Sequence, residues 1–393
     1  MVGCFISREG KIGIGRDRFT LAKYPTKLCS HIIFDAAVNE NFEAVIIEFY
    51  SSPCDSHDVQ PYILEPSWYE VLRDMKRNDS NLKVILSFGR YDKFADSTKD
   101  SPDNIIVPSF SEFFKQMLAD IRRRITFIHS AISLIAQNDF DGIHIDYEIM
   151  PQEKQLILQY TQLLQELRMA LDKRTVFERK QLLLTKVLYG SQQQIDVYDQ
   201  SDLNTFLDYI FLSPVYLKNG SIEHSIDREV NEEAETGDLS KRNIIISAYY
   251  LHRKGIPKSK IVLGIPSYAV YGSLRNNQQS SAVTSQLQQP HIAASGIMAY
   301  DEVCKLLGKT DNTDLLDNDS IPFIVFGDKW LSFENRRSIA AKTLWLKQHQ
   351  FAGAFSWTMD LDDHQGSCPK NIPFRVITTI RHFLSEPATR NRQ

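Results

Sequence analysis

Short apolar segments alternate with longer amphipathic segments along this chain of 393 residues. The short segments read as strands, and the longer ones repeat Leu, Ile and Phe at helical spacing with charged residues on the other side. Eight strands alternating with helices predict a parallel sheet that closes into a (β/α)8 TIM barrel. The predicted strands cover residues 2–7, 31–38, 83–89, 142–148, 182–188, 209–215, 261–268 and 353–359. The helix-like spans include residues 67–78, 111–137, 155–173, 242–254 and 334–350.

One stretch interrupts this alternation between the seventh and eighth predicted strands. Residues 272–330 are rich in Gln, Ser, Asn and Asp, and the stretch is too long for an ordinary loop. Within it, residues 297–304 resemble a helix start and residues 321–326 a strand. We therefore expect a small α+β insertion at residues 272–330, a barrel formed by residues 1–271 and 331–386, and a mobile polar tail at residues 387–393.

Composition excludes several classes of protein. The net charge is -4 and no long basic run occurs, so we expect no nucleic-acid partner. No run of 18 apolar residues predicts a membrane span, and the first residues lack the long apolar segment of a signal peptide. The five cysteines show no Cys-x-x-Cys spacing, so we expect neither a metal site nor a cofactor. We expect a monomer.

The segment from Phe140 to Glu148 carries two carboxylates within an apolar run. Alternation with a period of two places His144, Asp146 and Glu148 on one face of the predicted fourth strand. A buried strand does not carry acids unless they do chemistry or meet a partner. Active residues of parallel barrels lie at the carboxyl ends of strands, and a carboxylate pair there suits glycoside cleavage.

The sequence Asp-Gly-Ile-His-Ile-Asp-Tyr-Glu at residues 141–148 resembles the signature of glycoside hydrolase family 18, the chitinases and chitinase-like lectins. Further segments resemble other strands of that family in the same order, so the likeness spans nearly the whole chain. They are residues 27–33, 82–89, 263–268 and 353–363. The resemblance implies a partner made of chitin, chito-oligosaccharides or other glycans that contain N-acetylglucosamine.

The resemblance also implies roles for individual residues. Glu148 would protonate the glycosidic oxygen, and Asp146 would orient the N-acetyl group of the sugar, whose own oxygen attacks the anomeric carbon. Trp357 would form the apolar floor under the reacting sugar. Asp141 matches the first acid of the signature, with its different parity indicating a bulge at Gly142. Tyrosines that would line the cleft are Tyr91, Tyr216 and Tyr268.

Several positions depart from the family pattern. His144 replaces the middle Asp, Tyr216 lies one place late after Val215, and Val270 replaces a sugar-binding Arg. His144 could form an ion pair with Asp146, worth about 1–4 kcal/mol at moderate effective dielectric. Each lost polar stabiliser of the transition state costs roughly a hundredfold to a thousandfold in rate. The pattern therefore predicts a very slow enzyme or a sugar-binding protein without turnover.

By the same resemblance, Cys4 would pair with Cys29 and Cys304 with Cys368, leaving Cys54 free. Such bridges imply an oxidising compartment, which favours an extracellular protein even without a recognisable leader.

Alternative interpretations remain open at this stage. Retention of Glu148 favours a hydrolase, whereas His144, Val215 and Val270 favour a lectin. Glu148 and Asp146 could both be structural acids, and His144 is more simply a structural partner than a base. The acids at 360, 362 and 363 are expected to cap the turn after the eighth strand, and Trp345 to pack in the core. A barrel that binds another protein through surface loops is a third possibility, without specific support.

Overall fold

A computed structural model shows how these segments are arranged in space. It describes residues 1–6, 19, 21, 24–25, 27–46, 68–89, 110–218, 221–224, 244–273, 297–307, 323–326, 329–368 and 370–386.

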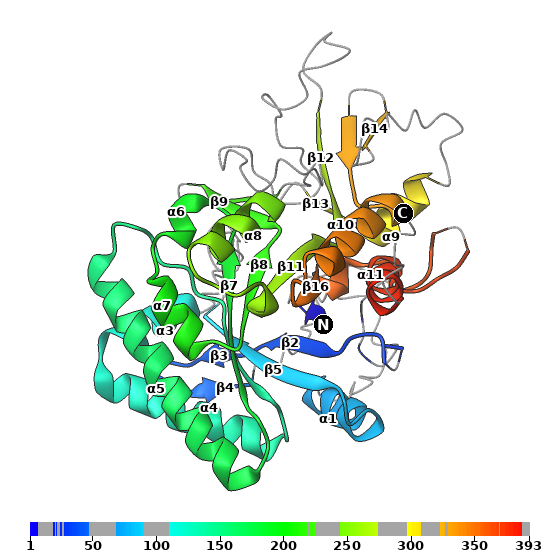
Figure 1. Ribbon diagram of the computed structural model, residues 1–393. Helices are drawn as coiled ribbons and strands as arrows, with labels where there is room; N and C mark the ends of the chain where they lie inside the picture. The colour runs from blue at the N-terminus through cyan, green and yellow to red at the C-terminus, as the bar shows by residue number, and fades with distance from the viewer. Residues whose placement is uncertain are drawn as a thin grey trace, which may run out of the picture.

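The centre of the molecule is a closed barrel of parallel strands, as predicted (Figure 1). Around the barrel the order is β1-β16-β11-β8-β7-β6-β5-β2. The strands are β1 (Val2–Ile6), β2 (His31–Asp35), β5 (Lys83–Phe88), β6 (Gly142–Ile145), β7 (Leu183–Tyr189), β8 (Tyr209–Ser213), β11 (Ile261–Pro266) and β16 (Gly353–Trp357). Each expected strand segment is present, and the fold class is confirmed.

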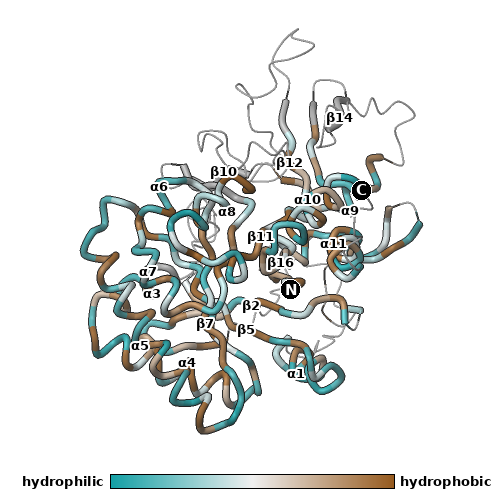
Figure 2. The backbone as a smooth tube through the Cα atoms, in the orientation of Figure 1, coloured by the Kyte–Doolittle hydropathy of each residue, from teal (hydrophilic) through white to brown (hydrophobic). Residues whose placement is uncertain are grey.

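Side chains from alternate strand positions fill the inside of the barrel. Phe5 contacts Phe211 and Phe355 there, with ring centroids 5.6 and 5.2 Å apart. The barrel is therefore a packed core and not a pore. In Figure 2 the strands are largely hydrophobic, whereas α4 (Ile121–Gln137) and α5 (Lys154–Glu178) alternate between hydrophobic and hydrophilic residues, as expected for helices with one face on the barrel.

The helical layer contains a break that was not expected from the sequence. The single helix expected at residues 111–137 is divided into α3 (Phe110–Ala119) and α4. The carboxylate of Asp120 accepts hydrogen bonds from the amides of Arg122 and Arg123 at 2.7 and 3.2 Å, and so caps the new helix. Among the described residues, the other α-helices outside the insertion are α1 (Trp68–Asn78), α6 (Gln192–Ile195), α7 (Gln200–Phe206), α8 (Ile244–Arg253), α10 (Arg336–Gln348) and α11 (Arg375–Ser385).

The insertion between β11 and β16 contains a second, antiparallel sheet, in the order β13-β12-β15-β14. Its elements are β12 (Tyr268–Ser273), β13 (Ile297–Ala299), α9 (Tyr300–Leu307), β14 (Phe323–Phe326) and β15 (Lys329–Ser332). Only Ser267 separates β11 from β12. The sheet therefore begins before residue 272, where the insertion was expected to start. The remaining short elements are β3 (Ala37–Val38), β4 (Ala44–Val45), β9 (Val215–Lys218), β10 (Ser221–His224), η5 (Lys258–Lys260) and η6 (Met359–Leu361).

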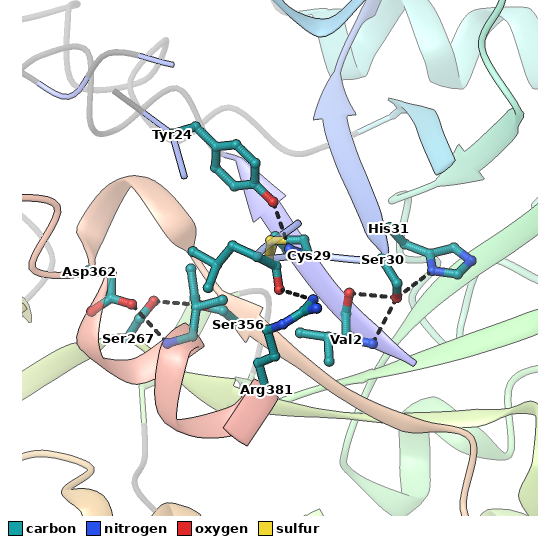
Figure 3. Close-up of a disulfide and its surroundings, with 12 residues drawn as sticks. Val2, Tyr24, Cys29, Ser30, His31, Ser267, Ser356, Asp362 and Arg381 are labelled. Carbon is teal, nitrogen blue, oxygen red and sulfur yellow. Dashed lines mark hydrogen bonds between the residues drawn. A yellow bond between two sulfur atoms is a disulfide. The ribbon is translucent and has the colours of Figure 1, made fainter. Parts of the chain in front are cut away.

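Two disulfide bonds fasten this framework, with the pairing that the family resemblance implied: Cys4–Cys29 and Cys304–Cys368. Figure 3 shows the surroundings of the first, where the Cys29 amide donates a hydrogen bond of 2.6 Å to the hydroxyl of Tyr24. Cys54 lies outside the described residues. None of the helices in the described ranges is long and apolar enough to cross a lipid bilayer.

Candidate functional site

Asp141 does not lie with the other acids of the motif. It directly precedes β6, so it sits at the amino end of the barrel, opposite the end that carries active sites in this fold. Its buried carboxylate accepts a 2.9 Å hydrogen bond from the Val84 amide and forms ion pairs with Lys76, Lys83 and Lys180. Burial by itself raises the pKa of Asp141, but the hydrogen bond and charge of Lys76, with the Val84 hydrogen bond and the Lys180 charge, together lower it below the usual value. We therefore assign Asp141 a structural position, contrary to its expected place in the catalytic group.

Gly142 does not mark a bulge. The register of β6 advances one residue at a time against β5 and β7, from Gly142 opposite Ile85 and Leu183 onwards. A side chain at Gly142 would collide with the carbonyl group of Leu183. Glycine is present because the neighbouring strand approaches closely.

His144 points into the barrel, and the ion pair expected with Asp146 is absent from its described contacts. Its Nδ1 lies 2.8 Å from the Thr185 hydroxyl, and its ring meets the edges of Phe5 and Phe211. Complete burial, with a contribution from the nearby Lys186 charge, lowers the pKa of His144 well below its usual value. The imidazole is therefore neutral near pH 7 and carries no charge with which to hold Asp146.

Asp146 follows β6 directly and lies at the carboxyl end of the barrel. It is 3% exposed, and its Oδ1 accepts a hydrogen bond of 3.5 Å from the hydroxyl of Tyr189 at the end of β7. Tyr189 belongs to the same buried interior cluster as Trp357 and Tyr268. Asp146 is thus linked through Tyr189 to a buried cluster that contains two of the predicted sugar-contacting residues, of which Tyr268 is fully buried.

Trp357 ends β16, and its backbone is held by the start of the insertion. The Ser267 amide donates a 3.0 Å hydrogen bond to the Trp357 carbonyl, and the Ser267 side chain bonds to Ser356 and Thr358. The indole lies against Phe5, with ring centroids 4.8 Å apart. Trp357 is only 5% exposed, so the indole is largely packed in the barrel mouth.

Glu148 has a different set of partners from Asp146, so the shared face expected for His144, Asp146 and Glu148 does not hold for Glu148. Its Oε2 lies 3.3 Å from the ammonium group of Lys186 on β7. The amide nitrogen of Gln194 on α6 donates to its Oε1 at 2.9 Å, and the hydroxyl of Tyr198 adds a further hydrogen bond. The Glu148 side chain is 6% exposed. The carboxylate is therefore enclosed by β7 and by the segment that follows it.

Burial sets the proton affinity of Glu148. It raises the pKa of this carboxyl to about 7, against the opposing charge and hydrogen bond of Lys186, and the nearby Asp146 charge adds to the increase. A carboxyl with such a pKa is protonated in a large share of molecules at neutral pH, which is what a proton donor requires.

The residues predicted for the site did not include Lys186, Gln194 or Tyr198. One signal was available for the first, since Lys186 is the only charged residue between Leu182 and Tyr189, a segment predicted to be a buried strand. No sequence pattern indicated that Gln194 and Tyr198 would meet Glu148.

Two predicted residues are not placed by their side chains. Tyr91 and its neighbours lie outside the described residues, and Tyr216 is described only through the backbone of β9. Val270 lies on β12, opposite Ile297 and Ser332 in the inserted sheet.

Two of the acids after β16 accept backbone hydrogen bonds: Asp363 within the turn, as expected, and Asp362 from the start of α11. Asp362 accepts hydrogen bonds from the amides of Val376 and Ile377 at the start of α11, at 3.2 and 3.0 Å. Asp363 accepts from the amides of Ser367 and Cys368. Trp345 packs in the core against Phe351, with ring centroids 5.1 Å apart, as predicted.

Known proteins resemble this chain along its whole length. The endochitinase of Brugia malayi is 27% identical over 394 residues, covering 97% of this chain and 72% of the relative. Human chitinase-3-like protein 2 is 27% identical, covering 93% of this chain and 88% of the relative. A probable endochitinase of Caenorhabditis elegans is 28% identical over 93% of this chain, which spans 57% of that relative.

Solved structures agree in fold. The immunomodulatory active chitinase of Trichuris suis aligns with a TM-score of 0.74 at 24% identity, covering 98% of this chain and 99% of the other. Human YKL-39, described as a pseudo-chitinase with retained chitooligosaccharide binding properties, aligns with a TM-score of 0.78 at 24% identity, over 98% of this chain and 99% of that one. The model of glycosyl hydrolases family 18 matches residues 1–362. With this match and the closed parallel barrel, the chain belongs to glycosyl hydrolase family 18.

Proposed function

We propose that the barrel mouth binds β-1,4-linked N-acetylglucosamine polymers and hydrolyses them slowly, with Glu148 as the acid. The observation that carries this proposal is the buried carboxyl group of Glu148, just past the end of β6 and two residues from Asp146, where burial raises its pKa to about 7. Burial gives Glu148 the proton that a leaving glycosidic oxygen needs.

In the proposed reaction Glu148 transfers its proton to the bridging oxygen as the bond from that oxygen to the anomeric carbon breaks. The carbonyl oxygen of the substrate's own N-acetyl group forms the new bond to that carbon. Asp146 orients the N-acetyl group and balances the positive charge that develops on it. Water then attacks the anomeric carbon and returns a proton to Glu148, so the sugar keeps its configuration.

A lectin-like protein without turnover is the second candidate. Support comes from the enclosure of Glu148 by Lys186, Gln194 and Tyr198, and from a neutral His144 at the place of an acid. YKL-39 is a precedent within the same fold for sugar binding in a pseudo-chitinase. The two disulfides support an extracellular location for either function.

Turnover of a fluorogenic chito-oligosaccharide separates the two candidates. We expect slow hydrolysis that falls above about pH 7 as Glu148 loses its proton. The matched variant Glu148→Gln preserves volume and hydrogen bonding, and should reduce the rate at least a hundredfold. Equal rates in both proteins would refute hydrolysis by Glu148.

Calorimetric titration with chitotetraose and chitohexaose tests binding separately. We expect heat of binding from both proteins, because stacking on the sugar does not need the acid. Binding without turnover would establish the lectin-like function, and the absence of both would refute the proposed function as a whole.

A further inference from the structure

Lys186 is a buried lysine in β7. The other residues of this strand are apolar, apart from one threonine and one tyrosine. Its neighbours Thr185 and Val187 face the barrel interior, where Thr185 meets His144 and Val187 joins the interior cluster. Alternation along β7 therefore turns Lys186 outward, towards the helices. The side chain is 0% exposed, so its ammonium group must find its partners within the protein.

The partners of this ammonium group are specific. It lies 3.3 Å from Glu148 Oε2, donates a 3.2 Å hydrogen bond to the Tyr147 carbonyl, and stands 4.9 and 4.4 Å from the ring centroids of Tyr160 and Tyr198. Two aromatic faces, a carbonyl and a carboxylate together replace the water that a lysine would otherwise keep. These groups together stabilise the buried ammonium group of Lys186 beside the proposed acid.

A cation in this place opposes proton donation. An ammonium group at hydrogen-bond distance favours the ionised carboxylate, whereas a general acid must carry a proton when the substrate arrives. The pair also draws Glu148 towards β7, while Asp146 and Trp357 belong with the interior residues of the mouth. Both effects act against the first step of cleavage.

We propose that Lys186 is a positioning residue that restrains Glu148: it favours the ionised carboxylate and holds it turned towards β7, so that cleavage requires the pair to open. The inference rests on the proposed function, since Glu148 is there the acid. It adds a determinant of turnover outside the family motif.

Other described groups that face Glu148 do not account for the same restraint. Asp146 carries a like charge and favours the protonated acid, and the hydroxyl of Tyr160 on α5 is neutral because burial raises its pKa. Tyr198 and Gln194 donate hydrogen bonds but carry no charge, with burial raising the pKa of Tyr198 also. Among these described neighbours, Lys186 is the residue with a positive charge, so a variant that lacks this lysine tests its restraint on Glu148 directly.

The kinetic test compares Lys186→Met with the wild-type protein across pH 4–9 on a fluorogenic chito-oligosaccharide. We expect the alkaline limb of kcat to move up by one pH unit or more, which is about a fivefold gain at pH 8 for a group that starts near pH 7. KM should stay within about twofold, since no sugar contact is removed. Lys180→Met removes a lysine at the opposite end of the barrel, and its pH profile should match that of the wild type.

A second measurement does not depend on turnover. Glutamate labelled with ¹³C at the carboxyl carbon reports the titration of Glu148, whose signal is identified by its disappearance in Glu148→Gln. We expect Lys186→Met to raise the apparent pKa of this signal by at least one unit. If that variant does not fold, the isosteric Glu148→Gln provides the reciprocal test, in which the pKa of ¹⁵N-labelled Lys186 should fall by a similar amount.

The outcomes separate the two proposals. A shifted Glu148 titration without hydrolysis in any variant would support the ion pair and refute the hydrolase. An unshifted titration in Lys186→Met, or in its absence an unshifted Lys186 signal in Glu148→Gln, would overturn the inference. A lower kcat in a folded Lys186→Met would also overturn it, because the lysine would then assist the reaction.

Discussion

The substitution Asp141→Asn tests whether the first acid of the motif is structural. The Asp141 carboxylate is 0% exposed and Lys76, its partner in an ion pair, is 9% exposed. Removing one member of a buried ion pair costs about 3–5 kcal/mol, because the other charge is left without compensation. Lys83 and Lys180 are 38% and 24% exposed and can turn to water, and asparagine still accepts the Val84 hydrogen bond, so we expect the lower end, about 3 kcal/mol.

Differential scanning calorimetry measures this loss. An unfolding entropy of about 2.1 cal/mol/K per residue converts about 3 kcal/mol into a decrease of roughly 4 °C in Tm for a chain of this length. Since the pKa of Asp141 is lowered in the folded protein, its contribution is present above the unfolded value of about 4 and disappears as the pH falls through the folded value. The difference from wild type should therefore shrink in strong acid.

A matched control is Asp74→Asn, which removes a carboxylate that pairs with Arg77 on α1 and is 64% exposed. Exposed pairs contribute about 0–1 kcal/mol, so its Tm should change by no more than about 1 °C. An Asp141→Asn protein with unchanged Tm would refute the structural assignment. Loss of glycan turnover without loss of stability would return Asp141 to the catalytic group.

Three further outcomes follow from the described contacts. His144→Asn should leave the alkaline limb of turnover in place, because the buried imidazole is already neutral there; a displaced limb in kinetic assays would show that it is charged. Glu334→Gln should lower the urea midpoint by the equivalent of about 3 kcal/mol by stranding the buried Lys342, and an unchanged midpoint would show that the pair contributes nothing. Replacing both Cys304 and Cys368 by Ser opens a link across 64 residues, for which loop-closure entropy predicts a loss of about 4 kcal/mol; calorimetry that finds less than 1 kcal/mol would contradict that account.

The barrel was predictable because each strand carries its own apolar signal. The expected segment at residues 83–89 differs from β5 by one residue, and the eighth strand begins where it was expected, at Gly353. The prediction of a single helix at residues 111–137 was wrong, because apolar residues continue at helical spacing beyond Asp120. Ile121 and Ile125 sustain that pattern although they are 58% and 59% exposed, so periodicity alone could not reveal the cap.

The candidate site was predictable only in part. The motif located Asp146 and Glu148 because acids in an apolar strand stand out in sequence. Their different surroundings depend on contacts between separate strands, such as Lys186 with Glu148, which lie 38 residues apart and share no local pattern. Asp141 was assigned to the catalytic group because the motif contains residues from both ends of one strand. In the structure Asp141 precedes β6 and lies at the amino end of the barrel, whereas Asp146 follows β6 and lies at the carboxyl end.

The disulfide between Cys304 and Cys368 joins α9 of the insertion to the turn beyond β16. Together with the direct passage from β11 into β12, it anchors the inserted sheet to the barrel at two points. An insertion attached at one edge alone could move over a bound polymer. A sheet attached at two points resists such a movement. Under the proposed function, a glycan would then meet a preformed shape.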